Sequence, residues 1–329
     1  MIALPGCYLA HVARGQARLL VASRPIPEVI DDPSSEPELR DALGLVAPTR
    51  EFARDLGLRV GQQYTSYAAW PGDRVVTSVV ATRPGEIDAA GFWFPLLGRV
   101  PYKGFFDPAR AEEEAARLRA NGLDTCVVPV PAYSTLGWLD DPVTGPMLRA
   151  GPGFLVETLI HELVHATVYV PSDADFDEGV ATFIGQEGAL RFFAADPAAE
   201  ERERARIGDE RAAARVLSEL RARIPALYAE PDTGQRAAGR AALEAEARRS
   251  LAALPLHGPD AARWAAALPL NDACLALAGS YERDLDAYAA RLAAGGGDLH
   301  AFVAEVRAAA AAPDPRAALG LPIAPVAGR

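Results

Sequence analysis

Two histidines four residues apart, His161 and His165, constrain the fold of this 329-residue chain more than any other feature. They lie in residues 154–169, an apolar stretch with helical spacing that begins just after Pro152. Residues four apart project from one helix face with Cβ atoms about 5–6 Å apart, so both imidazoles can reach a single ion. Because an ion needs further ligands, the fold must bring a second element against this helix.

Glu162 completes the pattern His-Glu-x-x-His. It is offset around the helix, near the ion without binding it. There it can take a proton from a water on the metal and pass it to the leaving amine. The extended pattern with a glycine and a third histidine is excluded, because Val168 and Pro171 occupy those positions. The alternative interpretation is two helix histidines with ordinary contacts.

A catalytic zinc takes a third protein ligand, for which Glu178 is the best candidate. It stands in Asp175-Phe176-Asp177-Glu178, the acidic start of the next helical segment, after enough chain for a turn and a reversal. Asp175 favours the positive helix N-terminus, and Asp177 either does the same or orients a ligand imidazole. We therefore predict a Zn²⁺ site formed by His161, His165 and Glu178.

Peptide hydrolysis places negative charge on the carbonyl oxygen, and a tyrosine hydroxyl can stabilise this charge. The candidates are Tyr102, Tyr133 and Tyr281. We favour Tyr133 as a catalytic residue, because it follows a predicted buried strand at 125–130 in a loop that leads to the metal helix. The alternative is that Tyr133 packs the loop together with Trp138. The strand itself could pair with an extended peptide through its edge.

Other charged residues have more than one interpretation. Glu157, one turn before His161, either orients that imidazole or is solvated. Lys103, the single lysine, either binds a substrate carboxylate or lies on the surface, which we favour. The charged runs 112–114 and 200–206 are typical of solvated helix faces. An enzyme that recognised a free N-terminus would also need an acid for the amine, and the sequence does not choose among Asp140, Asp141 and Glu187.

The character of the chain changes near residue 152. Before it, the pattern predicts a hairpin over residues 63–82, a helix opened by Asp107-Pro108 and the strand at 125–130. We predict an α+β, zincin-like fold, with a small antiparallel sheet in a mixed N-terminal part and a predominantly helical C-terminal part. The predicted parts are 1–151, the helical metal-binding catalytic part 152–311, and a loose tail at 312–329.

Charge and cysteine content limit partners and location. The net charge is −11 and no basic stripe offsets it, which argues against nucleic-acid binding. Cys126 and Cys274 could pair, but we interpret Cys126, in an apolar run, as a buried thiol. Leu4-Pro5-Gly6-Cys7 matches a lipoprotein cleavage site. If a signal segment lies upstream, a lipid on Cys7 would tether the chain in the cell envelope; otherwise we expect a cytoplasmic protein.

The His161–His165 pattern followed by Asp-Glu-Gly-Val-Ala-Thr-Phe at 177–183 resembles the gluzincin clan, and the segment is similar to the Asn-Glu-Gly-Phe-Ala stretch of aminopeptidase N-type enzymes. Most of the chain resembles a bacterial family described as predicted aminopeptidases, many of them described as lipoproteins. The segments that carry this second resemblance are Cys7-Tyr8 with Gly15-Gln16, 101–107, 132–138, 157–169, 176–188 and 271–281. It implies a zinc peptidase.

The expected function is zinc-dependent hydrolysis of peptide bonds, with an aminopeptidase favoured and Glu162 as the general base. Two alternatives stay open. One is a zinc hydrolase of non-peptide amides or esters, which would use the same metal and the same site. The other is a non-catalytic envelope protein with a structural metal, although structural zinc usually has four protein ligands and we find three. The sequence does not indicate an oligomeric state.

Overall fold

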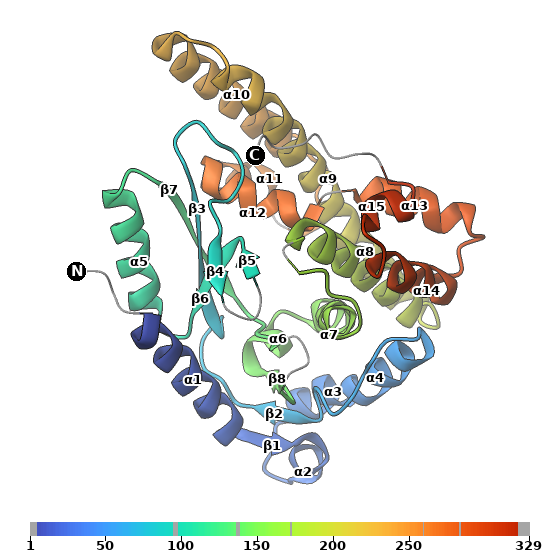
Figure 1. Ribbon diagram of the computed structural model, residues 1–329. Coiled ribbons are helices and arrows are strands. Elements are labelled where there is room, and N and C mark those ends of the chain that lie inside the picture. The colour runs from blue at the N-terminus through green and yellow to red at the C-terminus, as the bar shows by residue number, and fades with distance from the viewer. Residues whose placement is uncertain are drawn as a thin grey trace.

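The computed structural model describes residues 5–94, 98–135, 139–171, 173–258, 260–282 and 284–321. The described strands all precede residue 145 and the later elements are helices, so the α+β class predicted from the sequence is confirmed (Figure 1). The strands are β1 (Ser23–Pro25), β2 (Ser66–Ala68), β3 (Val76–Thr82), β4 (Phe92–Phe94), β5 (Gly98–Val100), β6 (Tyr102–Phe105), β7 (Asp124–Val130) and β8 (Val143–Thr144).

The early helices flank these strands: α1 (Pro5–Val21), α2 (Ile26–Asp31), α3 (Pro37–Gly44), α4 (Val46–Asp55), α5 (Pro108–Ala120) and α6 (Gly145–Arg149). The later helices are α7 (Pro152–Thr167), α8 (Ala174–Phe192), α9 (Pro197–Tyr228), α10 (Thr233–Ala252), α11 (Ala261–Ala267), α12 (Asp272–Glu282), α13 (Leu285–Ala294), α14 (Leu299–Ala310) and α15 (Pro315–Ala318). Among the described helices, none combines the length and the apolar composition that crossing a bilayer requires.

The central sheet has the antiparallel order β6-β3-β7 and is covered on both faces. Alternate residues of a strand point to opposite faces. On β3, Val79 and Ala81 pack with α5, while Val80 packs with Ala273 and Ala276 of α12. Figure 1 shows α5 and α12 on opposite sides of these strands. Double coverage explains why all seven residues of β3 are buried.

The hairpin predicted over residues 63–82 is wrong. β2 pairs antiparallel with β1 and parallel with β8, whereas β3 belongs to the other sheet. The backbone N–H of Val75 donates to the carbonyl of Val130 on β7 (2.9 Å) instead of turning back toward β2. Because β3 is apolar on both faces, it gains more from burial at the centre of a sheet than from pairing with the short and more polar β2.

β7 lies at the edge of its sheet and is only partly buried. Thr125 and Cys126 are buried, but Pro129 is exposed. Proline has no N–H to donate and is tolerated on edge strands. The fully buried strand predicted for residues 125–130 is therefore wrong in its second half, and an edge position leaves room for the peptide pairing considered above.

Part of the predicted loose tail is ordered. Residues 315–318 form α15, which Asp314 caps by accepting from the N–H of Ala317 (2.9 Å). Leu319 and Leu321 are 4% and 6% exposed and join the main core, which explains why this segment is not loose. Residues 322–329 lie outside the described part of the chain.

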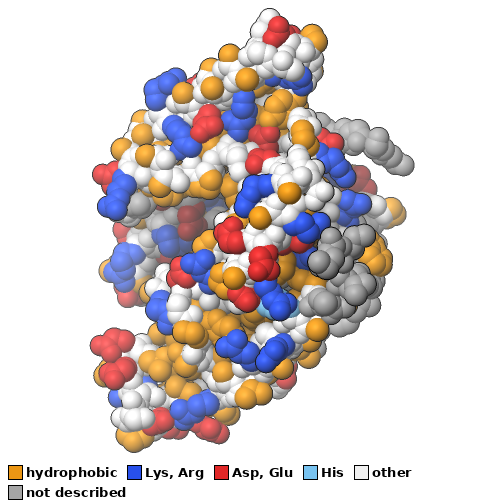
Figure 2. Space-filling model, turned by 90° about the vertical axis from the view of Figure 1, so that its left-hand side faces the viewer, with side chains coloured by type: hydrophobic (Ala, Val, Ile, Leu, Met, Phe, Trp, Pro, Cys, Tyr) orange, Lys and Arg blue, Asp and Glu red, His pale blue; other side chains and the backbone are white. Residues whose placement is uncertain are grey.

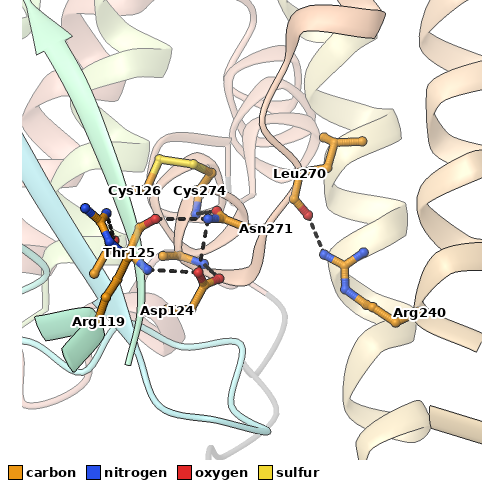
Figure 3. The surroundings of a disulfide bond; sticks show 9 residues. Arg119, Asp124, Thr125, Cys126, Arg240, Leu270, Asn271 and Cys274 are labelled. Carbon is orange, nitrogen blue, oxygen red and sulfur yellow. Dashed lines mark hydrogen bonds between the residues drawn. A yellow bond between two sulfur atoms is a disulfide. The ribbon is translucent and has the colours of Figure 1, made fainter. Parts of the chain in front are cut away.

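Cys126 of β7 and Cys274 of α12 form a disulfide, so the interpretation of Cys126 as a free buried thiol is wrong. Figure 3 shows Asn271 beside the bond, between the strand and the helix. Its amide nitrogen donates to the carboxylate of Asp124 (3.1 Å) and to the carbonyl of Thr125 (2.9 Å). A covalent bond and two hydrogen bonds therefore fix α12 on the sheet.

Lys103 is not the surface lysine that we favoured. Its side chain is 19% exposed, and its ammonium donates to Glu114 (3.0 Å) and lies 4.4 Å from the centre of the Tyr8 ring. Glu114, 8% exposed, also accepts from Arg117, so the run 112–114 is only partly solvated. Lys103 thus joins α1, the sheet and α5.

Acidic and basic side chains are interspersed over the face formed by α1 and α5 (Figure 2). This face carries no continuous basic stripe among the residues that the structure describes. α1 also exposes the apolar side chains of Leu9, Leu20 and Val21.

Candidate metal centre and the adjoining cleft

Helix α7 carries the two histidines through the middle of the molecule. Gly151, at a φ of +101°, lets the chain turn into the helix, and Pro152 occupies the first turn, where its missing N–H is harmless. The helix is apolar on nearly all sides because α4, α6 and α8 pack around it. His161 and His165, one turn apart, are therefore held in a rigid setting.

Helix α8 approaches α7 closely because glycines line the contact. A Cβ added to Gly185 would lie 3.1 Å from the carbonyl oxygen of Glu157, and one added to Gly188 would lie 2.8 Å from Ile160 Cδ1. Asp173 caps the helix by accepting from the N–H of Phe176 (3.2 Å). The close packing places the buried Glu178 opposite the histidines.

Three side-chain atoms converge at this contact. Nε2 of His161 and Nε2 of His165 are 3.1 Å apart, and each lies 3.4 Å from Oε2 of Glu178. Four ligands placed tetrahedrally about 2.0–2.1 Å from a zinc ion would stand about 3.3–3.4 Å from one another. Oε2 of Glu178 is buried, and no donor among the described residues hydrogen-bonds it. The three atoms thus fit three corners of a tetrahedron.

The electrostatics of these side chains favour a cation. Burial disfavours the charged imidazolium of His165, but the nearby Glu178 carboxylate outweighs this effect and raises the pKa of His165 to about 9. Burial alone would raise the pKa of Glu178, yet the two imidazoles hold it below its ordinary value. A carboxylate that is kept ionised in the interior needs a positive partner, which a proton on His165 or a metal ion can provide.

Tyr102, rather than Tyr133, lies beside the predicted ligands. The Tyr102 hydroxyl donates to Oε1 of Glu178 (3.4 Å). The Tyr133 ring packs against Phe106, with centroids 4.9 Å apart, in a cluster with Trp70 and Val130. The catalytic role of Tyr133 stays a prediction, and Tyr102 is the better-placed tyrosine. The Tyr281 side chain lies outside the described residues.

Asp177 and Glu157 have partners other than the histidines. Asp177 accepts from the N–H of Val170 (2.9 Å) and so closes the turn between α7 and α8. Nδ1 of His165 is buried without a hydrogen-bond partner in the described part of the chain, so Asp177 does not orient this imidazole by a direct hydrogen bond. Glu157 pairs with Arg206 of α9.

A cleft of about 330 Å³ opens beside His161, one of the three candidate ligands. Its lining comes from the end of β7 and the loop that follows (Val130, Pro131, Ala132), from α7 (Phe154, Glu157, Thr158, His161, Glu162), from α8 (Thr182, Gln186), from α9 (Glu210, Arg211, Ala214) and from Leu285. Glu162 and His161 therefore line the same hollow.

The sequence pattern did not indicate the contribution of α9. The interpretation of the run 200–206 as a solvated helix face is wrong. Glu203 is 4% exposed, and the Arg206 guanidinium contacts Glu157, Glu203 and Glu210. The spacing of Glu203, Arg206 and Glu210 places them on one helix face and could have suggested a cluster. Their partner Glu157 is 49 positions away, which no local pattern indicates.

None of the acids proposed for a free amine lines this cleft. Asp140 is exposed on its loop, and Asp141 is buried and accepts from the N–H and the hydroxyl of Thr135 (2.6 and 2.8 Å). Glu187 is neutralised by Arg191 (2.8 Å) and Arg211 (3.1 Å).

A helix pair with a His-Glu-x-x-His pattern and a facing glutamate beside a cleft is similar to the sites of metal-dependent hydrolases. The sequence model of the family described as "Putative aminopeptidase" matches residues 7–319, and the chain belongs to this family. No curated protein and no solved structure matches the chain.

Proposed function

We propose that this chain is a zinc-dependent peptidase of the gluzincin type, with His161, His165 and Glu178 as ligands and Glu162 as general base. The observation that carries the proposal is the convergence of three ligand atoms, 3.1–3.4 Å apart, beside a cleft that also contains Glu162. Membership of a family described as aminopeptidases supports peptide bonds as the substrate. The zincin-like character of the fold is part of the same proposal.

The bound ion would supply Lewis acidity, which polarises a peptide carbonyl and makes water easier to deprotonate. Glu162 would take the proton of the attacking water and deliver it to the leaving amine. Tyr102 would donate its hydroxyl to the oxygen on which negative charge develops. The Glu178 carboxylate and burial hold the pKa of Tyr102 well above its ordinary value, so its hydroxyl keeps its proton at neutral pH.

The edge of β7 supports an extended peptide as the ligand. Val130 ends this edge strand and lines the cleft together with Glu162. A peptide backbone that paired with the edge would therefore run past the ligands.

The disulfide supports a location outside reducing compartments, because disulfide bonds persist mainly in oxidising ones. We therefore favour the cell envelope among the two locations considered above, with Cys7 as the site of a lipid tether.

The deciding experiment combines metal analysis with hydrolysis of short peptides. Wild type is expected to bind about one zinc per chain and to cleave peptides, and removal of the metal by a chelator should abolish cleavage. Glu162→Gln should retain zinc and lose turnover by at least about 10²-fold, since general-base catalysis contributes about 10²–10⁴. Loss of zinc from Glu162→Gln, or hydrolysis only of esters and non-peptide amides, would contradict the proposal.

A further inference from the structure

The cleft beside the ligands contains acids that the proposed mechanism does not use. Glu157 of α7 and Glu210 of α9 line the same hollow as His161 and Glu162. Among the described residues of this lining, Arg211 is the one arginine, and its guanidinium already donates to Gln186 (2.7 Å) and Glu187 (3.1 Å).

A single guanidinium contacts three carboxylates beside this cleft. Arg206 donates to Glu210 (2.6 Å) and also contacts Glu157 and Glu203. Because one guanidinium can balance only one carboxylate charge, the group has an excess of negative charge next to the cleft whenever its acids are ionised. A cationic ligand in the cleft would reduce this excess, and an anionic ligand would increase it.

The carboxylates differ in their access to a ligand. The side chains of Glu157 and Glu203 are 15% and 5% exposed, whereas that of Glu210 is 47% exposed. Glu210 can therefore accept a further donor from the cleft while it keeps its contact with Arg206. Glu157 offers less surface, but it belongs to the same helix as the candidate ligands.

The spacing along α7 suits one amino-acid residue. Glu157 precedes His161 by four positions, which is about one helical turn of 5.4 Å. In a peptide, the α-nitrogen of a residue lies about 2.5 Å from its own carbonyl carbon. A peptide whose first carbonyl lies at the candidate ion would thus carry its terminal nitrogen within reach of acids one turn away.

The raised pKa values of these two acids agree with a shortage of positive charge around them. Burial and the neighbouring Glu210 carboxylate raise the pKa of Glu157 to about 7. Burial also raises the pKa of Glu210, although Arg206 opposes this effect. An ammonium group bound between the two would favour the ionised form of both carboxylates.

From the cleft, the shared arginine and this spacing, we propose that Glu157 and Glu210 bind the α-ammonium group of a substrate with a free N-terminus and position its first peptide bond at Glu162. This proposal rests on the proposed function and deepens it. It assigns Glu210 as the main determinant of specificity for free N-termini, with release of a single terminal residue.

The test is a binding measurement on the inactive Glu162→Gln protein with zinc bound, using tri-alanine amide and its N-acetylated form as probes. The free amine is expected to bind at least about tenfold more tightly, as hydrogen bonds to charged groups contribute about 1.5–3 kcal/mol. Adding Glu210→Gln should remove this difference by weakening the free peptide alone. Glu201→Gln, at an exposed position of the same helix, is the matched control and should preserve it.

Turnover supplies the second measurement. Wild type should release alanine from the free peptide, and Glu210→Gln should lower kcat/KM for that peptide by about 10–100-fold. Equal binding of the two peptides, or an unchanged difference in Glu210→Gln, would overturn the inference. So would an effect of Glu210→Gln on N-acetyl-lysyl peptides alone, which would indicate side-chain recognition. If Glu210→Gln does not fold, Glu157→Gln tests the same claim.

Failure of the proposed function would look different. A protein that binds free peptides selectively but never hydrolyses them would contradict the enzymatic proposal and leave the amine site standing. A protein that hydrolyses free and acetylated peptides equally would leave the peptidase standing and reject the amine site.

Discussion

At the scale of single residues, Tyr102 and Tyr133 differ in the part of the side chain that makes the main contact. The Tyr102 hydroxyl lies 3.4 Å from an oxygen of Glu178, whereas Tyr133 presents its ring to Phe106. A hydroxyl next to one ligand of the candidate ion is also close to the position that a substrate oxygen would take there. Tyr102 is therefore the tyrosine that we expect to act during hydrolysis.

Tyr102→Phe is expected to lower kcat by about 10²–10³-fold, the usual effect of removing one donor to a developing oxyanion. KM and zinc content should change little. The measurement is steady-state kinetics on a short peptide at saturating zinc, with Tyr133→Phe as the matched variant. If Tyr102→Phe loses zinc and recovers full kcat when zinc is added, the hydroxyl holds Glu178 in place and does not act on the substrate.

Asp141 is a residue for which the structure predicts a pH effect on stability. Burial raises the pKa of its carboxyl from 3.8 to about 6, against the opposing hydrogen bonds from Thr135. The folded chain therefore favours the neutral acid. Asp141 contributes stability that is fully present below the unfolded pKa near 4 and is lost as the pH rises through about 6.

Between pH 4 and pH 7, the unfolding free energy of the wild-type chain should thus lose on the order of 3 kcal/mol more than that of Asp141→Asn, since each pKa unit corresponds to about 1.4 kcal/mol. Urea unfolding of metal-free protein at the two pH values measures this difference. Asp140→Asn, at the exposed neighbouring position, should behave as wild type. An identical pH dependence in Asp141→Asn would show that the carboxyl titrates normally in the fold.

At the scale of elements, the candidate site depends on how closely α8 lies against α7. A Cβ on Gly185 would meet the backbone oxygen of Glu157 at 3.1 Å, which cannot move without moving α7. Gly208 on α9 has no atom within 4 Å of such a Cβ. The two glycines therefore form a matched pair, one at a tight contact and one in open space.

Gly185→Ala is expected to destabilise the chain by about 1–2 kcal/mol, because overpacking outweighs the helix propensity gained. It should also weaken zinc binding, since Glu178 on the displaced helix would move away from His161 and His165. Gly208→Ala should be neutral or stabilise by up to about 1 kcal/mol. Thermal unfolding and zinc titration measure both effects. Unaltered zinc affinity in Gly185→Ala would show that the helix spacing does not set the ligand geometry.

The elements that could be predicted from sequence are those with local signals. The cap at Asp107 predicted α5, and the helical spacing of residues 154–169 predicted α7. The acidic start of the next helix suggested Glu178 as the third ligand. The predicted hairpin at 63–82 was wrong because the pairing of β3 depends on burial of both its faces by α5 and α12. The Arg206 cluster was missed for a similar reason, since its members come from two helices that meet only in the folded chain.

At the scale of the whole molecule, the Cys126–Cys274 bond closes a span of 148 positions between the sheet and the helical part. α12 contacts α8, which carries Glu178, while the end of β7 lines the cleft. The bond thus connects the strand whose end lines the cleft to a helix that packs against the helix carrying Glu178. Its formation could not be read from the sequence, because the cysteines become neighbours only after the sheet and the helices have packed.

In the chain-entropy description, a cross-link over a loop of this length stabilises the fold by about 5 kcal/mol, because it restricts the unfolded chain. The double variant Cys126→Ala/Cys274→Ala should lose about this amount of unfolding free energy in denaturant titrations. A reductant should lower the stability of the wild type toward that of the variant and leave the variant unchanged.

Peptidase activity of the fraction that remains folded should be retained, because neither cysteine lines the cleft. Equal stability of variant and wild type would mean that the cross-link does not form in solution. A folded variant that has lost its activity would mean instead that the bond holds β7 and α8 in the geometry that hydrolysis requires.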